Sequence, residues 1–93
     1  MSGLARECVL QLAPGCRLNS AGGSEDFLLI PEGALRLKGR ARNIVELCDG
    51  IRTVGQIVIE LQQRFAGGDA IRIESDTIAL LGRLFDRGAL KPV

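Results

Sequence analysis

The spacing of apolar residues changes from a strand repeat to a helical repeat near Lys38, and this change constrains the fold more than any other feature of the chain. Residues 27–30 form a continuous apolar run of strand length. A Pro-Glu-Gly turn follows, and residues 34–38 then alternate between leucines and basic side chains. Together with a brief alternation at 16–19, these segments predict a three-stranded antiparallel meander whose third strand lies at an edge.

Beyond Lys38 the apolar residues recur at helical spacing. The three segments that show this spacing are 40–48, 53–65 and 75–87. Gly50 is placed to end the first helix, Thr53 and Gln56 form a capping box that opens the second, and Ser75 can cap the third. The predicted fold class is therefore α+β, with a winged helix-turn-helix-like arrangement in which the meander is followed by a three-helix bundle.

The third predicted helix carries two apolar stripes. We expect Ile78, Leu81 and Phe85 to face the core, with Leu80 and Leu84 forming a flanking stripe. A helix with a spare apolar stripe suggests that it lines an oily groove.

Length and composition predict a single domain. The chain has 93 residues, of which 46% are hydrophobic, so it can bury a core but is too short for two domains. The residues before Pro14 resemble a loosely ordered segment with a few apolar anchors. We therefore expect a flexible N-terminal arm at 1–14 and a folded domain at 15–93.

The residue inventory argues against catalysis, metal binding and membrane insertion. The sequence has no His, and none of its three cysteines (Cys8, Cys16 and Cys48) forms a Cys-x-x-Cys pair. The acidic residues are scattered, and no apolar run approaches transmembrane length. We expect a cytoplasmic protein that is not an enzyme and needs no cofactor or metal.

Four basic residues occur within seven positions: Arg36, Lys38, Arg40 and Arg42. This cluster is either a solvated face or a positive patch that steers an acidic partner. DNA is a poor fit, because residues 74–87 carry three acids against two arginines in the helix that would enter the major groove. A net charge of +1 likewise predicts no nucleic-acid partner.

The predicted edge strand 34–38 is the remaining candidate for a binding surface. Its outer amide and carbonyl groups can pair with another peptide as an added strand, with side pockets supplying specificity. The alternative is that Arg36 and Lys38 only protect the edge from aggregation. Physical reasoning leaves both interpretations open.

Two stretches of the sequence resemble the PqqD family, which serves pyrroloquinoline quinone (PQQ) biosynthesis. They are FLLIPEGALRL at 27–37 and IVELCDGIRTV at 44–54, and the similarity continues to Arg87-Gly88-Ala89-Leu90. The resemblance implies a peptide chaperone that binds the precursor peptide PqqA and presents it to the radical-SAM enzyme PqqE. It also implies a binding groove between the third strand and the third helix.

Carried onto this sequence, the groove comprises residues of the edge strand and the outward side of the last helix. These residues are Ala34, Leu35, Arg36, Leu37, Lys38, Leu80, Arg83, Leu84 and Arg87. The chain departs from the family at Ile30, where an aromatic residue is often found, and at Lys38-Gly39, where an Asn is common. Two alternatives remain: a recognition domain for another ribosomally synthesised modified peptide, and a winged-helix DNA-binding regulator.

Overall fold

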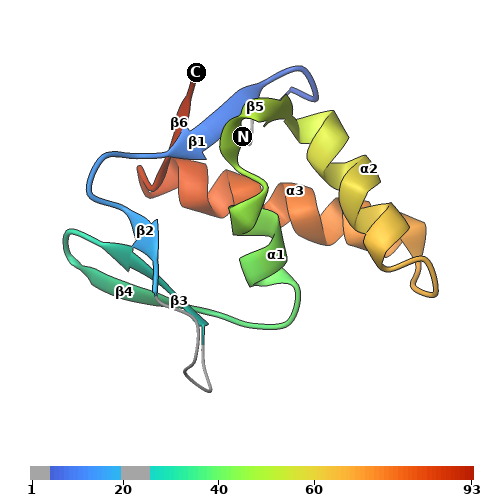
Figure 1. The fold of residues 1–93 in the computed structure, drawn as a ribbon, viewed down its shortest axis with the longest axis horizontal. Coiled ribbons are helices and arrows are strands. Elements are labelled where there is room, and N and C mark those ends of the chain that lie inside the picture. Colours follow the sequence, from blue (N-terminus) through green and yellow to red (C-terminus); the bar gives the residue numbers. More distant parts are fainter. Residues whose placement is uncertain (1–4, 20–25) are drawn as a thin grey trace.

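The computed structural model describes residues 5–19 and 26–93 and has an α+β fold with antiparallel strands and three helices. In chain order the elements are β1 (Val9–Leu12), β2 (Arg17–Leu18), β3 (Asp26–Ile30), β4 (Gly33–Leu37), α1 (Ala41–Glu46), β5 (Asp49–Thr53), α2 (Val54–Arg64), α3 (Ala70–Asp86) and β6 (Leu90–Pro92). Figure 1 shows α3 running across the middle of the molecule, with sheet β5-β1-β6 above it and sheet β2-β3-β4 below. The fold class expected from the sequence is therefore confirmed at the level of α+β.

The sheet β2-β3-β4 contains the three strands expected from the sequence, and β4 lies at its edge. Asp26 pairs with Leu37 and Ile30 with Gly33, so the β3–β4 hairpin is in register along its whole length. Leu28 in the middle of β3 is fully buried. The continuous apolar run of β3 thus supplies the core side of this sheet, as the sequence indicates.

A second sheet, β5-β1-β6, was not expected from the sequence. Residues 1–14 were predicted to be a flexible arm, yet Val9–Leu12 form the central strand of this sheet, and Leu10 is 0% exposed. Val9 pairs with Thr53 in β5, and Leu10 pairs with Pro92 in β6. The strands therefore do not all precede the helices: β5 separates α1 from α2, and β6 follows α3.

The helix starts are partly as expected. The capping box of α2 is confirmed, because the Gln56 amide donates to Thr53 Oγ1 at 3.1 Å and the Thr53 amide donates to Gln56 Oε1 at 2.8 Å. The predicted start of the third helix at Ser75 is wrong. Helix α3 begins at Ala70, where the Asp69 carboxylate accepts hydrogen bonds from the amides of the first turn.

The buried face of α3 is also displaced from the predicted stripe. Leu84 is only 3% exposed and belongs to the core, whereas Phe85 is 38% exposed. Leu81 is fully buried, as expected, and Ile78 is partly buried. The cause is that α3 packs against elements on two sides, α1 and α2 as well as β6, so its buried face is wider than one stripe.

Candidate functional site

The edge strand β4 presents alternate backbone groups away from its neighbour. The Asn19 amide donates to the Phe27 carbonyl at 3.0 Å, so the backbone of Phe27 faces β2. Phe27 lies opposite Arg36, and Leu29 lies opposite Ala34. Because hydrogen-bonded and non-hydrogen-bonded pairs alternate in an antiparallel ladder, the amides of Ala34 and Arg36 point away from β3, toward the outer edge.

A hollow of about 210 Å³ separates this edge strand from α3. Its lining residues are Leu35, Arg36 and Leu37 from β4, and Leu80, Arg83, Leu84 and Arg87 around α3. All the sequence-predicted site residues except Ala34 and Lys38 thus line one hollow. Ala34 is exposed on the same strand. We call this hollow the edge groove.

A second hollow of about 440 Å³ continues the edge groove past the end of β4. Its lining residues are Lys38, Gly39, Arg40, Ala41, Ile44, Asp76, Ala79, Leu80 and Arg83. The two hollows share Leu80 and Arg83, so they form one continuous surface along α3. Sequence reasoning placed Lys38 here but missed the contribution of α1, because nothing local indicates which side of α3 that helix covers.

The structure divides the two leucines of the predicted flanking stripe. Leu80 is partly buried and lines both hollows. Leu84 lines the edge groove but is almost completely buried in the core. Leu80 therefore lines the groove, whereas Leu84 is mainly structural, and a charge introduced at Leu84 would destabilise the fold.

The basic cluster does not act as one patch. The Arg42 guanidinium turns away to Asp26, at 3.1 Å, and to Glu46, at 3.4 Å. Arg40 lies 3.6 Å from an Asp76 carboxylate oxygen, and its guanidinium lies 5.4 Å from the centroid of the Phe65 ring. Each of these two arginines has an acidic neighbour, so the cluster cannot be treated as four equivalent steering charges.

The groove nevertheless keeps a positive lining. Within residues 5–19 and 26–93, Lys38, Arg83 and Arg87 form no ion pair. Arg36 lies over the Phe27 ring, 6.0 Å from its centroid, and also lines the edge groove. Among the residues that the structure describes, the lining of the edge groove contains no acid. The surface is thus apolar at its base, basic around it, and complementary to an acidic extended segment.

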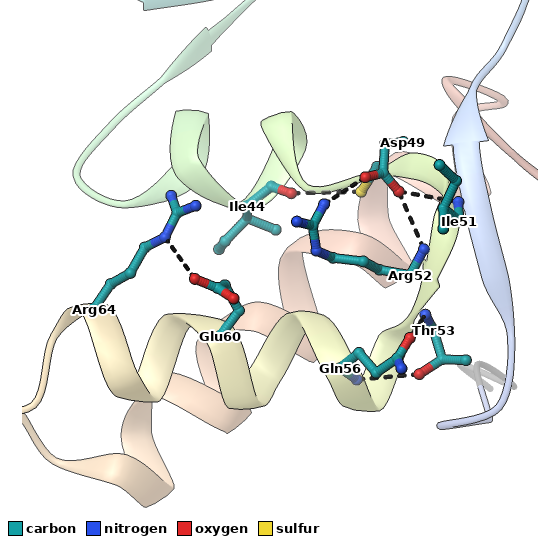
Figure 2. A network of polar contacts seen from close by, with 9 residues as sticks. Ile44, Asp49, Ile51, Arg52, Thr53, Gln56, Glu60 and Arg64 are labelled. Atoms are coloured by element: carbon teal, nitrogen blue, oxygen red, sulfur yellow. Dashed lines mark hydrogen bonds and ion pairs between the residues drawn. The ribbon is translucent and has the colours of Figure 1, made fainter.

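A third hollow, of about 520 Å³, lies beside β5 and α2 and differs in character. Figure 2 shows its polar residues: the Asp49 carboxylate accepts hydrogen bonds from the amides of Ile51 and Arg52, at 3.0 and 3.1 Å, and pairs with the Arg52 guanidinium. These hydrogen bonds hold the pKa of Asp49 below its usual value. Ile51 and Ile59, which also line this hollow, are 79% and 55% exposed.

The cysteines offer no reactive centre in this arrangement. Burial, with a smaller effect from the Asp49 charge, raises the pKa of the Cys48 thiol to about 12, so this thiol is protonated at neutral pH. Cys8 and Cys16 are half-buried and lie immediately before β1 and β2, respectively. In the part of the chain that the structure describes, no three His, Cys, Asp or Glu residues gather in a way that could hold a metal ion.

Comparison with known proteins identifies the family. The family described as "Coenzyme PQQ synthesis protein D (PqqD)" matches residues 25–90, a range that holds β4, α1 and the whole of α3. The chain belongs to the PqqD family. Across the described ranges, no helix is both long enough and apolar enough to cross a membrane.

Curated members of the PqqD family match over nearly the whole chain. The PqqA binding protein of Xanthomonas axonopodis pv. citri is 33% identical over 92 residues, which cover 98% of this chain and 99% of that protein. The PqqA binding protein of Methylococcus capsulatus is 29% identical over 91 residues, which cover 97% and 95%. With 98% of this chain covered, the Xanthomonas match reaches β1 near one end and β6 near the other.

Solved structures show the same fold. The PqqD portion of Methylobacterium extorquens PqqCD, described as a functional and stand-alone recognition element for ribosomally synthesized and post-translationally modified peptides, matches with a TM-score of 0.77 and 30% identity. The match covers 97% of this chain and 96% of that one. The heterocyclase TruD matches with a TM-score of 0.61 and 25% identity, over 92% of this chain but only 12% of TruD.

Proposed function

We propose that this chain is a peptide chaperone that binds the PqqA precursor peptide and presents it to the radical-SAM enzyme PqqE during PQQ biosynthesis. Its curated relatives are PqqA binding proteins, and they match over almost their full length. The observation that carries the proposal is the edge groove, in which a strand edge with outward amides faces a helix that supplies Leu80 and two arginines. Such a groove suits an extended peptide.

Binding proceeds by strand addition. The peptide pairs with the outward amide and carbonyl groups of Ala34 and Arg36 and so extends the sheet to four strands. Its alternate side chains then point into the edge groove, where Leu35 and Leu80 exclude water from them. The backbone contacts provide affinity for any extended chain, and the groove side chains provide the choice of sequence.

The chain performs no covalent step of its own. Its part is to hold PqqA in an extended, accessible form at one edge of a small cytoplasmic protein, and the chemistry belongs to the enzyme that receives the peptide. Three groove cations that form no ion pair within the described ranges favour rapid encounter with an acidic peptide: Lys38, Arg83 and Arg87. They lie on the groove side of α3 and at the end of β4.

A recognition domain for another modified peptide is the second candidate. The likeness to part of TruD favours it, because that likeness places a similar fold inside a heterocyclase. A winged-helix DNA-binding regulator is the weaker third candidate. The basic residues Arg83 and Arg87 of the α3 region lie around the edge groove, which argues against this candidate.

The test is a titration of isotopically labelled protein with synthetic PqqA, followed by NMR amide shifts. We expect shifts clustered on β4 and the second half of α3, with α2 unchanged. Shifts confined to α2 and β5 would contradict strand addition at β4. Titration with duplex DNA at low and high salt serves as the comparison, since DNA binding would weaken steeply as salt rises.

A further inference from the structure

The side chain of Arg42 joins helix α1 to the sheet β2-β3-β4. Its Nη1 donates to Asn19 Oδ1 at 3.0 Å and to Asp26 Oδ1 at 3.1 Å, and its Nη2 donates to the Asn19 carbonyl at 3.1 Å. Its Nε donates to Glu46 Oε2 at 3.4 Å, within α1. All three nitrogens of the guanidinium are therefore engaged, and the side chain is only 20% exposed. Arg42 faces the sheet, not a partner.

The two residues that Arg42 reaches are coupled to the edge strand. Asn19 Oδ1 also accepts a hydrogen bond from the Phe27 amide at 2.9 Å, and the Asn19 amide donates to the Phe27 carbonyl at 3.0 Å. Asp26 begins β3 and pairs with Leu37, the last residue of β4. Leu37 in turn lines the edge groove. A shift of Asp26 is therefore passed across one ladder pair to the wall of the groove.

The orientation of this sheet relative to the helices depends on attachments at different points across its width. The turn at 38–40 joins β4 to α1, while the edge groove of about 210 Å³ separates β4 from α3. The buried side chains of Leu28 and Leu37 hold the sheet to the core, but apolar contact is not directional. Arg42 adds a directional contact, because its planar fork bonds to β3 and to the residue directly after β2.

We propose that Arg42 is a positioning residue for peptide capture. By holding the end of β2 and the start of β3 to α1, it fixes the orientation of the sheet relative to α3 and thus the width of the edge groove. The effect on PqqA rests on the proposed function, whereas the orientation is a property of the free protein. Lysine cannot replace Arg42, because an ammonium group donates from one nitrogen and these contacts leave from three.

The first test measures the orientation in the free protein. Residual dipolar couplings of labelled Arg42→Lys report how sheet β2-β3-β4 lies relative to α2 and α3. We expect couplings of β3 and β4 to depart from the parent orientation while those of the two helices still fit it. A merely stabilising role would leave all couplings of the folded protein unchanged. Sheet couplings that fit the parent orientation in Arg42→Lys would overturn the proposal.

Arg64→Lys is the matched control for this substitution. Arg64 Nε donates to Glu60 Oε2 at 3.1 Å, so both arginines form an i,i+4 pair with a glutamate through the same nitrogen. Arg64 ends α2 and does not line the edge groove. We expect its sheet couplings to match those of the parent. A change equal to that in Arg42→Lys would show that any lost arginine has this effect and would overturn the proposal.

The second test measures PqqA binding by fluorescence anisotropy, with affinities corrected for the folded fraction. Arg42→Lys should weaken binding about three- to tenfold although the charge is kept, with Arg64→Lys within twofold of the parent. A steering charge would be replaced by lysine without loss. Asp26→Ala should also weaken binding, and the double variant should lose no more than the larger single loss, because both changes break one contact. Fully additive losses would contradict a shared positioning role.

The two tests separate this inference from the proposed function. If PqqA binds neither the parent nor the variants, the proposed function is wrong, and the couplings alone decide whether Arg42 holds the sheet. If PqqA binds the parent and Arg42→Lys equally, the proposed function stands and the positioning proposal falls.

Discussion

The backbone amides of two edge strands, β4 and β5, have different surroundings. On β4 the amides of Ala34 and Arg36 point outward beside a basic, apolar groove. On β5 the amides of Ile51 and Arg52 are taken by the carboxylate of Asp49 (Figure 2). The two edges therefore differ in what lies beside them: a hollow bounded by α3 at β4, and a carboxylate that accepts from the strand amides at β5.

The side chains beside the two edges differ as well. Next to β5, Asp49 pairs with Arg52 and Glu60 with Arg64, so the charges cancel locally. Next to β4, the basic residues outnumber their acidic partners. The difference indicates that β5 is an edge protected against pairing, although Ile51 is largely exposed on it. The following predictions test this contrast.

The largest effect is expected on the stability of the fold, from a charge placed at Leu84, which both lines the edge groove and belongs to the core. Leu84→Asp places a carboxylate in a site that is almost completely buried, so it should destabilise the fold by at least about 3 kcal/mol. Leu80→Asp, one turn earlier and only partly buried, should keep the fold but weaken PqqA binding. Thermal unfolding by circular dichroism and a binding titration measure the two effects. A folded Leu84→Asp variant would contradict the assignment of Leu84 to the core.

Proline on each edge gives the most direct comparison. Ala34→Pro removes an outward amide of β4, and with a hydrogen bond worth about 0.5–1.5 kcal/mol and a displaced strand we expect at least a tenfold loss of PqqA affinity. Ala34→Val keeps the amide and is the control, with binding within threefold. Ile51→Pro on β5 should lower stability, because it removes the hydrogen bond to Asp49, but should leave PqqA affinity unchanged. Equal losses from both prolines would remove the distinction between the edges.

Charge reversal at the end of β4 should change the rate of association. Lys38→Glu should slow PqqA association about three- to tenfold at low salt and change dissociation much less. The difference should shrink as salt rises, because exposed charges are screened over about 8 Å at physiological ionic strength. Lys91→Glu in β6, an exposed lysine outside the lining of either groove hollow, is the control. An unchanged association rate for Lys38→Glu would contradict a role of Lys38 in attracting the peptide.

The smallest effect is expected at Asp49. Asp49→Ala releases the amides of Ile51 and Arg52, so the melting temperature should fall slightly and self-association through β5 should increase in sedimentation experiments. Since the folded pKa of Asp49 is lowered, its contribution is present above the unfolded value of about 3.9 and is lost as pH falls through the folded value. The difference between parent and Asp49→Ala should therefore vanish in strong acid. A difference that persists there would contradict the carboxylate's role.

Local signals in the sequence predicted the parts of the fold that local chemistry determines. The β3–β4 hairpin follows from the apolar run and the Pro-Glu-Gly turn, and the α2 capping box follows from Thr53 and Gln56. Sheet β5-β1-β6 was missed because its pairs, such as Leu10 with Pro92, join residues far apart in the sequence. Strand β1 is short and interrupted by Gln11, so nothing nearby distinguishes it from an arm.

The candidate site was predictable in outline and not in its details. The edge strand and the basic α3 residues follow from alternation and family resemblance, and the structure brings most of them around one hollow. The rotation of α3 was not predictable, because Leu84 and Phe85 are adjacent and either could complete the apolar stripe. Asp69 and Ser75 are both residue types that cap the N-terminus of a helix well. Helix α3 starts at the earlier of the two, and this start places Ile73 in the core.

The pairing of β1 with β6 has a consequence for the order in which the molecule assembles. Strand β6 follows α3 directly, and the Ala89 carbonyl accepts a hydrogen bond from the Ala13 amide at 2.9 Å, so the sheet fixes the end of α3 that carries Arg83 and Arg87. This closure needs residues 90–92 to be present, and contacts of such long sequence separation form slowly. The β3–β4 hairpin can form early, but the peptide groove has its second wall only once the two distant ends of the chain have met.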